Sequence, residues 1–97
     1  MIAEIDGSKV RSEIDFHNSI ADILRLPHHY GRNLDALWDV LSTDVERPLR
    51  IIWRDSYLSQ AAMPECFARI VEVLRRVERQ DMEWSLPEAE RFEVVLS

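Results

Sequence analysis

The stretch from residue 26 to residue 41, LPHHYGRNLDALWDVL, joins a turn that contains glycine to a short amphipathic helix. Asn33 is a good N-cap for this helix, which the leucine and tryptophan spacing predicts near residues 34–43. Asp35 and Asp39 flank the apolar face, one helical turn apart, so their like charges repel at a cost of about 0.2–0.5 kcal/mol. The cluster favours a cationic partner, with an ordinary solvated helix face as the alternative.

Short apolar runs around this stretch predict strands, at residues 1–6, 49–53 and 92–96. Helices are predicted in every gap: from the cap Ser12 to Pro27, over 34–43, over 56–62 with Ser56 as its cap, and over 64–80, with a loop over 81–90. Such alternation favours a parallel sheet with right-handed crossovers, covered on both faces. We therefore expect residues 1–97 to form a single α/β domain, a three-stranded parallel sheet packed with about four helices.

Two local details are also expected. Gly31 permits the left-handed backbone of a tight turn just before the acidic helix. Glu65 with Arg69, and Glu72 with Arg76, have the i, i+4 spacing of ion pairs on the last predicted helix.

Charge and cysteine content restrict the class of protein. The net charge of −6, from 18 acidic and 12 basic residues, disfavours nucleic acid as a partner and favours a basic protein. Cys66 is the single cysteine, which excludes an internal disulfide and indicates a reducing compartment. The N-terminus lacks the features of a signal peptide, and no segment has the ~18 apolar residues of a membrane span. We expect a soluble, cytoplasmic protein with no membrane partner.

Metal or cofactor binding is not predicted. His28 and His29 are adjacent and rarely converge on one ion, His17 lies on a different segment, and no Cys/His spacing supports them. Cys66 is expected to be a buried small hydrophobe, although its place in the first turn of a helix could lower its pKa.

An enzyme is not predicted either. Two carboxylates such as Asp35 and Asp39 can catalyse proton transfer only when their environments separate their pKa values, and an exposed i, i+4 pair offers no such separation. The chain has no nucleophile elbow, phosphate-binding loop or dinucleotide-binding motif.

The motif Leu26-Pro27-x-x-Tyr30-Gly31-x-Asn33-Leu34-Asp35-Ala36-Leu37-Trp38-Asp39 resembles the barstar family of intracellular ribonuclease inhibitors. The likeness extends to an early Asp-Gly-x-x-Val-Arg-Ser, to Val45-Glu46-x-Pro48-Leu49 with Trp53-Arg54, and to Val95-Leu96-Ser97. It therefore covers nearly the whole chain. The resemblance implies a three-stranded parallel sheet with four helices. It also implies a stoichiometric inhibitor that blocks the active site of a basic ribonuclease such as barnase.

The resemblance implies roles for single residues. The Asp39 position occupies the pocket for the RNA phosphate, since a carboxylate accepts the same bidentate bonds from guanidinium groups. The Asp35 position and the backbone of Asn33 and Leu34 contact the rim, and the Trp38 position packs at the interface edge. The full predicted partner-binding set is His29, Tyr30, Gly31, Asn33, Leu34, Asp35, Trp38, Asp39, Thr43, Asp44 and Arg76.

Three positions depart from the family pattern. His29 stands in place of a key loop tyrosine, Asp44 in place of a second interface tryptophan, and Arg76 in place of an interfacial glutamate. Arg76 reverses a charge and would place a cation against a cationic rim, unless that rim differs or Glu72 neutralises Arg76 within the chain. These departures leave open whether the partner is barnase or a related ribonuclease toxin, for which this chain would be the immunity protein. We expect a 1:1 complex, and a monomer when the chain is free.

Two other functions stay open at this point. The chain could be a barstar-like scaffold for self-association or regulation without a nuclease target, with Trp38, Trp53 and Trp84 forming a homodimer surface. An enzyme that uses His28, His29 and the acidic cluster is the other possibility.

Overall fold

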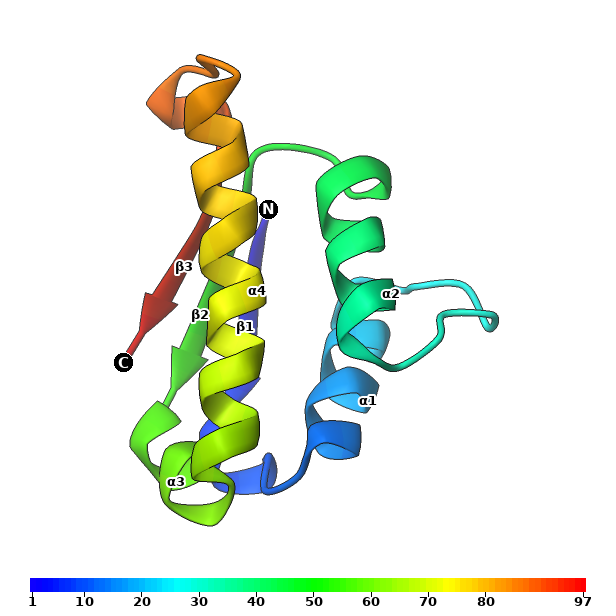
Figure 1. Cartoon of the computed structure of the whole chain (residues 1–97), viewed down its shortest axis with the longest axis vertical. Coiled ribbons are helices and arrows are strands. Elements are labelled where there is room, and N and C mark those ends of the chain that lie inside the picture. Colours follow the sequence, from blue (N-terminus) through cyan, green and yellow to red (C-terminus); the bar gives the residue numbers. More distant parts are fainter.

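A three-stranded parallel sheet forms one layer of the computed structural model, which describes residues 1–97 (Figure 1). The strands are β1 (Ile2–Asp6), β2 (Leu49–Arg54) and β3 (Phe92–Leu96). They pair in sequence order, with Ile5 opposite Trp53 and Ile51 opposite Val94. The expected α/β fold with three parallel strands and four helices is confirmed.

Four α-helices connect these strands: α1 (Glu13–Ile23), α2 (Leu34–Asp39), α3 (Ser56–Ala62) and α4 (Pro64–Glu83). Short helical turns add η1 (Gly7–Lys9), the π-helical η2 (Val40–Asp44) directly after α2, and η3 (Glu88–Glu90). Two expected caps are present, because the side chains of Ser12 and Asn33 accept hydrogen bonds from the backbone N–H groups of Asp15 and Ala36. The expected cap Ser56 is wrong: it is the first residue of α3, and the N-cap position is held by Asp55, which makes no side-chain cap hydrogen bond.

Two predicted helix ends are wrong. The first helix ends at Ile23 rather than next to Pro27, because Arg25 adopts a left-handed backbone with φ 53°. The last helix continues to Glu83, so the predicted loop over 81–90 contains the end of α4 and the whole of η3.

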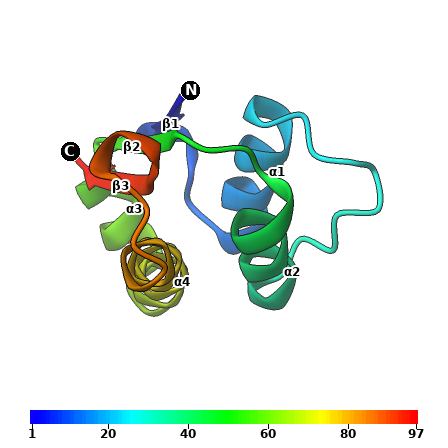
Figure 2. The same cartoon turned by 90° about the horizontal axis from the view of Figure 1, so that it is seen from above.

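Helices cover only one face of the sheet. Buried and exposed residues alternate along β1 and β2, and the exposed side chains form ion pairs across the strands, Arg54 with Glu4 and Arg50 with Glu93. Figure 2 shows α4 against one face and no helix on the other. The expectation of two covered faces is therefore wrong. Strands that pair in sequence order, with crossovers of one hand, place every connection on the same face.

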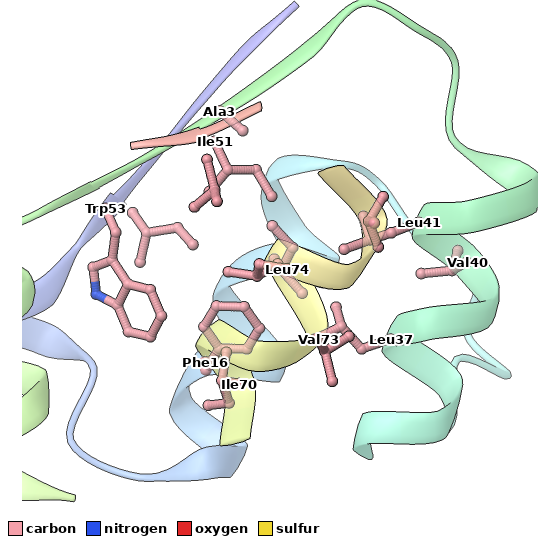
Figure 3. Close-up of a cluster of buried hydrophobic side chains, with 14 of the residues drawn as sticks. Ala3, Phe16, Leu37, Val40, Leu41, Ile51, Trp53, Ile70, Val73 and Leu74 are labelled. Carbon is pink, nitrogen blue, oxygen red and sulfur yellow. The ribbon is translucent and has the colours of Figure 1, made fainter. Parts of the chain in front are cut away.

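The hydrophobic core lies between this covered face and the helices (Figure 3). Trp53 is fully buried, with its ring 5.1 Å from that of Phe16 and 5.0 Å from that of Phe67. Its indole N–H donates to Ser59 Oγ at 3.2 Å, which satisfies the only polar group of the side chain. Because Trp53 has no exposed surface, its expected part in a homodimer surface is wrong.

A buried acid joins α4 to the sheet. Asp81 is 1% exposed and accepts hydrogen bonds from Arg47 Nε at 2.7 Å and from the backbone N–H of Phe92 at 2.7 Å. The side chain therefore fixes both the approach to β2 and the first residue of β3 against the end of α4.

None of the helices combines the length with the apolar composition that a membrane-spanning helix needs.

Candidate protein-binding site

The two aspartates of α2 form an exposed acidic ridge. The side chains of Leu37 and Leu41 are fully buried. With about 100° of rotation per residue, they direct Asp35 and Asp39 away from the core. Both aspartates are exposed, and neither takes part in an ion pair within the chain. The ridge thus carries two like charges without internal compensation.

A groove of about 480 Å³ separates α2 from α4 and borders the ridge on one side. It is lined by Leu34, Asp35, Trp38, Ala68, Arg69, Glu72, Val73 and Arg76. The guanidinium carbon of Arg76 lies 4.5 Å from the centre of the Trp38 ring, a cation–π contact across the groove. We call this hollow the α2–α4 groove. It brings together four of the predicted site residues.

A smaller hollow of about 160 Å³ borders the ridge on the other side, between α2 and the loop that precedes it. It is lined by Pro27, His29, Tyr30, Gly31, Ala36, Asp39, Val40 and Asp44. We call this hollow the loop–α2 pocket. It brings together five more of the predicted residues, with the Asp39 carboxylate at the boundary between pocket and ridge.

The two remaining predicted residues lie at the ends of the helical segment. Asn33 is the N-cap of α2, and its side-chain oxygen accepts from Ala36 N at 2.8 Å. Thr43 lies in η2, where its hydroxyl donates to the backbone carbonyl of Asp39. Thr43 therefore stabilises the backbone directly beneath the ridge.

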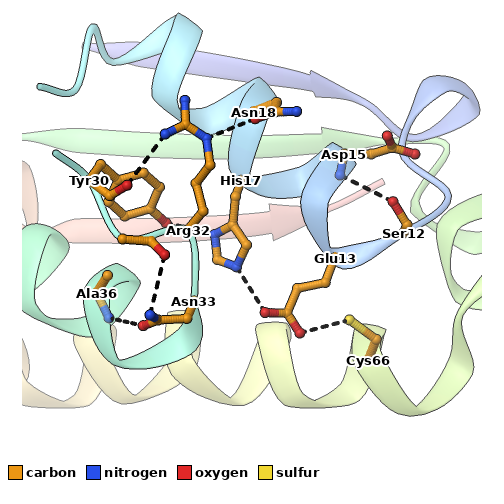
Figure 4. A network of polar contacts seen from close by, with 11 residues as sticks. Ser12, Glu13, Asp15, His17, Asn18, Tyr30, Arg32, Asn33, Ala36 and Cys66 are labelled. Atoms are coloured by element: carbon orange, nitrogen blue, oxygen red, sulfur yellow. Dashed lines mark hydrogen bonds and ion pairs between the residues drawn. The ribbon is translucent and has the colours of Figure 1, made fainter. Parts of the chain in front are cut away.

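Tyr30 is a buried residue of the loop, and only 7% of its surface is exposed. Its hydroxyl group lies 2.7 Å from His17 Nδ1 on α1. The other ring nitrogen, His17 Nε2, is 3.1 Å from a Glu13 carboxylate oxygen, as Figure 4 shows. Burial raises the pKa of Tyr30 and lowers the pKa of His17, because both charged forms would lose hydration. This network ties the loop to α1.

The network continues to α4 through Glu13, whose second oxygen accepts from Cys66 Sγ at 3.5 Å (Figure 4). Burial and the Glu13 carboxylate raise the pKa of the Cys66 thiol, so the possible lowering by the helix N-terminus does not occur. The role of His17 was missed in the sequence. Its position on the apolar side of α1, one residue after Phe16, was the available signal.

The tight turn before α2 differs from the expectation. No glycine has a positive φ, and Arg32 instead adopts the left-handed conformation with φ 49°. The Arg32 side chain stabilises this turn by donating to Asn18 Oδ1 at 2.9 Å and to the carbonyl of Tyr30 at 3.3 Å. Gly31 is instead favoured by the limited space at this position, because an added Cβ would lie only 3.1 Å from the Cβ of Ala36.

The two expected ion pairs on α4, Glu65 with Arg69 and Glu72 with Arg76, are also wrong, because neither is formed. Glu72 accepts from Arg79 at 2.9 Å, two turns further along α4, while Arg76 packs on Trp38. Arg76 therefore has no carboxylate partner within the chain, and its positive charge lies beside the acidic ridge.

Comparison with known proteins finds a matching family and a similar curated protein. The family model described as Barstar (barnase inhibitor) matches residues 1–97. The curated "Putative ribonuclease inhibitor YrdF" of Bacillus subtilis (strain 168) is 32% identical over 76 residues, which are 78% of this chain and 84% of that protein. Both descriptions name the inhibition of a ribonuclease.

Proposed function

Because the chain belongs to the Barstar family of barnase inhibitors, we propose that it blocks the active site of a basic ribonuclease with the acidic ridge of α2. Family membership and the likeness to a ribonuclease inhibitor support a barnase-inhibitor-like role, and the members of this family are inhibitors rather than enzymes. The proposal also includes a 1:1 complex with a barnase-like ribonuclease or a related ribonuclease toxin. It further includes a cytoplasmic location and a role as an immunity protein.

The observation that carries the proposal is the state of the two ridge carboxylates. Asp35 and Asp39 are exposed, unpaired and four residues apart on a helix whose other side is anchored in the core. A carboxylate offers the acceptor geometry that an arginine fork uses for a phosphate group. The ridge can therefore replace two anionic groups of RNA in a cationic cleft, and burial against arginines would remove the repulsion between them.

The hollows on either side of the ridge supply the rest of the surface. The loop–α2 pocket places His29 and Asp44 next to Asp39, and the α2–α4 groove places Trp38 next to Asp35. Tyr30 is buried, so we propose that it stabilises the loop and does not contact the ribonuclease directly.

The proposal is tested by titrating the chain into barnase and into a panel of secreted basic ribonucleases while RNA cleavage is followed. We expect one ribonuclease to lose all activity at one equivalent. Asp39→Ala should then weaken binding by about 2 kcal/mol or more, which is roughly 30-fold in Kd, through faster dissociation. Asp22→Ala is the matched control, because it removes the same charge from an exposed position on α1.

Full ribonuclease activity across the panel would refute the proposal. So would an Asp39→Ala variant that binds as tightly as the parent. Sedimentation of the pure chain tests the scaffold alternative, since a monomer at all concentrations excludes self-association.

A further inference from the structure

The α2–α4 groove contains positive charges that have no partner within the chain. Arg69 and Arg76 both line the groove, and neither forms an ion pair. Glu72, the acid of α4 that also lines the groove, is already bound by Arg79. Two guanidinium groups are thus available next to an acidic ridge.

Trp38 contacts one of these groups with its ring. The guanidinium carbon of Arg76 lies 4.5 Å from the ring centre of Trp38. A stacked guanidinium uses its flat face, whereas its N–H donors lie in its plane and point outward at the edge. The edge of Arg76 can therefore donate two parallel hydrogen bonds to a carboxylate without leaving the tryptophan.

We propose that the α2–α4 groove receives a carboxylate side chain of the ribonuclease, bound by Arg76 with Arg69 beside it. This inference rests on the proposed function and specifies the partner more closely. The ribonuclease surface opposite this chain would bear an acid next to its cationic active site. A ribonuclease with a cation at that place would be repelled by Arg76, so the groove would select among related enzymes.

The charges around the groove favour a single protein carboxylate over RNA. Asp35 lines the groove as well, Asp39 follows one turn later, and the chain carries a net charge of −6. A polyanion that reached the arginines would have to pass these acids, whereas one carboxylate can lie between the guanidinium groups.

The test uses the full chain and whichever of barnase and the panel ribonucleases it inhibits most tightly. Arg76→Glu should raise Kd at least about tenfold, mainly through faster dissociation, and Arg76→Lys should lie between it and the parent. Arg69→Glu should also weaken binding, and it leaves the contact between Arg76 and Trp38 in place. Arg11→Glu is the matched control, because it changes the net charge equally at an exposed site before α1.

The outcomes separate the inference from the proposed function. If Asp39→Ala loses binding while Arg76→Glu and Arg69→Glu bind as tightly as the parent, the groove does not bind a carboxylate and the proposed function stands. Equal weakening by Arg76→Glu and Arg11→Glu would show only an effect of net charge and would also overturn the inference. Binding of a short RNA to the free chain, lost in Arg76→Glu, would overturn it in favour of phosphate. A panel in which no ribonuclease is inhibited removes the proposed function itself.

Discussion

α2 and α4 lie side by side, but they are held in place in opposite ways. α4 has 20 residues and buries a continuous stripe that includes Phe67, Ile70 and Leu74. α2 has only six residues, with Leu37 as its one buried side chain. A helix this short is not stable by itself in water, because too few hydrogen bonds follow the costly first turn. α2 therefore depends on its cap and on the segments at its two ends, whereas α4 is held by packing along its whole length.

The contacts that hold α2 come from both of its ends and from beneath. Asn33 caps its first turn, and Leu41 in η2 anchors the segment that follows. The loop before it is tied to α1 through Tyr30 and His17. This arrangement leaves Asp35 and Asp39 of α2 exposed while the backbone of the helix is held at both ends. Four substitutions test the difference between the two helices.

The largest effect on stability is expected in the half of the molecule built on α4. Asp81→Ala removes the acceptor for the Arg47 guanidinium and for the Phe92 backbone N–H. We expect a loss of about 3 kcal/mol in the free energy of unfolding, measured with urea. Glu83→Ala, at an exposed position on the same helix, should change stability by less than about 0.5 kcal/mol. A loss below about 1 kcal/mol in Asp81→Ala would mean that α4 does not need this acid.

The next effect is a pH dependence that originates beneath the loop. The pKa of His17 is lowered from 6.5 because the folded protein buries the imidazole. Below pH 6.5 the unfolded chain therefore takes up a proton that the folded chain does not. The free energy of unfolding should fall as the pH is lowered from 6.5, by at most about 1.4 kcal/mol per pH unit. No contribution from His17 is expected above that range.

Urea unfolding between pH 5 and pH 7.5 measures this slope. Asp6 and Glu4 do not interfere, since their lowered pKa values place any loss of their contribution at a lower pH. His17→Gln should flatten the slope, whereas His29→Gln, on the exposed part of the loop, should preserve it. A slope that survives His17→Gln would assign the pH dependence to other groups.

A smaller effect is expected from the cap of α2. Asn33→Ala leaves the N–H of Ala36 without its side-chain acceptor and should lower the free energy of unfolding by about 1 kcal/mol. Amide hydrogen exchange should accelerate in α2. It should not change in α4, because the first turn of α4 has no side-chain cap and does not depend on Asn33. Ser12→Ala removes the corresponding cap from α1, and its effect on exchange should stay in that helix. Unchanged exchange in α2 would show that its packing alone holds it.

The smallest effect should have the opposite sign. Asp39→Asn removes the repulsion from Asp35 and a negative charge near the C-terminal end of α2, so it should raise the free energy of unfolding by about 0.5 kcal/mol. The same variant should bind the ribonuclease more weakly. Asp22→Asn serves as the control for removal of an exposed charge. A destabilised Asp39→Asn variant would show that the ridge carries no strain in the free protein.

The elements of the fold were predictable because their signals are local. The alternation of short apolar runs with capped, amphipathic segments predicted three parallel strands and four helices, and the caps Ser12 and Asn33 were found at their expected places. The ends of α1 and α4 were not predictable to the residue. A left-handed backbone at Arg25, unlike one at glycine, has no clear sequence signal.

For the candidate site, the sequence could propose a set of residues but not the surface that they form. The i, i+4 spacing placed Asp35 and Asp39 on one exposed face. It could not show that two hollows flank them, because the walls of these hollows come from the preceding loop and from α4. Spacing alone predicted Arg76 as the partner of Glu72. In the structure Arg76 packs on Trp38, and Glu72 pairs with Arg79.

By itself the sequence determined the strands, the helices and a pair of like charges on one helical turn, because these features depend on neighbours within a few residues. Only the tertiary structure decided that one sheet face stays open, that His17 and Tyr30 meet inside the protein, and that Arg76 stacks on Trp38 beside the ridge. Each of these contacts joins residues that are distant along the chain. Their geometry follows from how whole elements pack, which no local pattern of residues encodes.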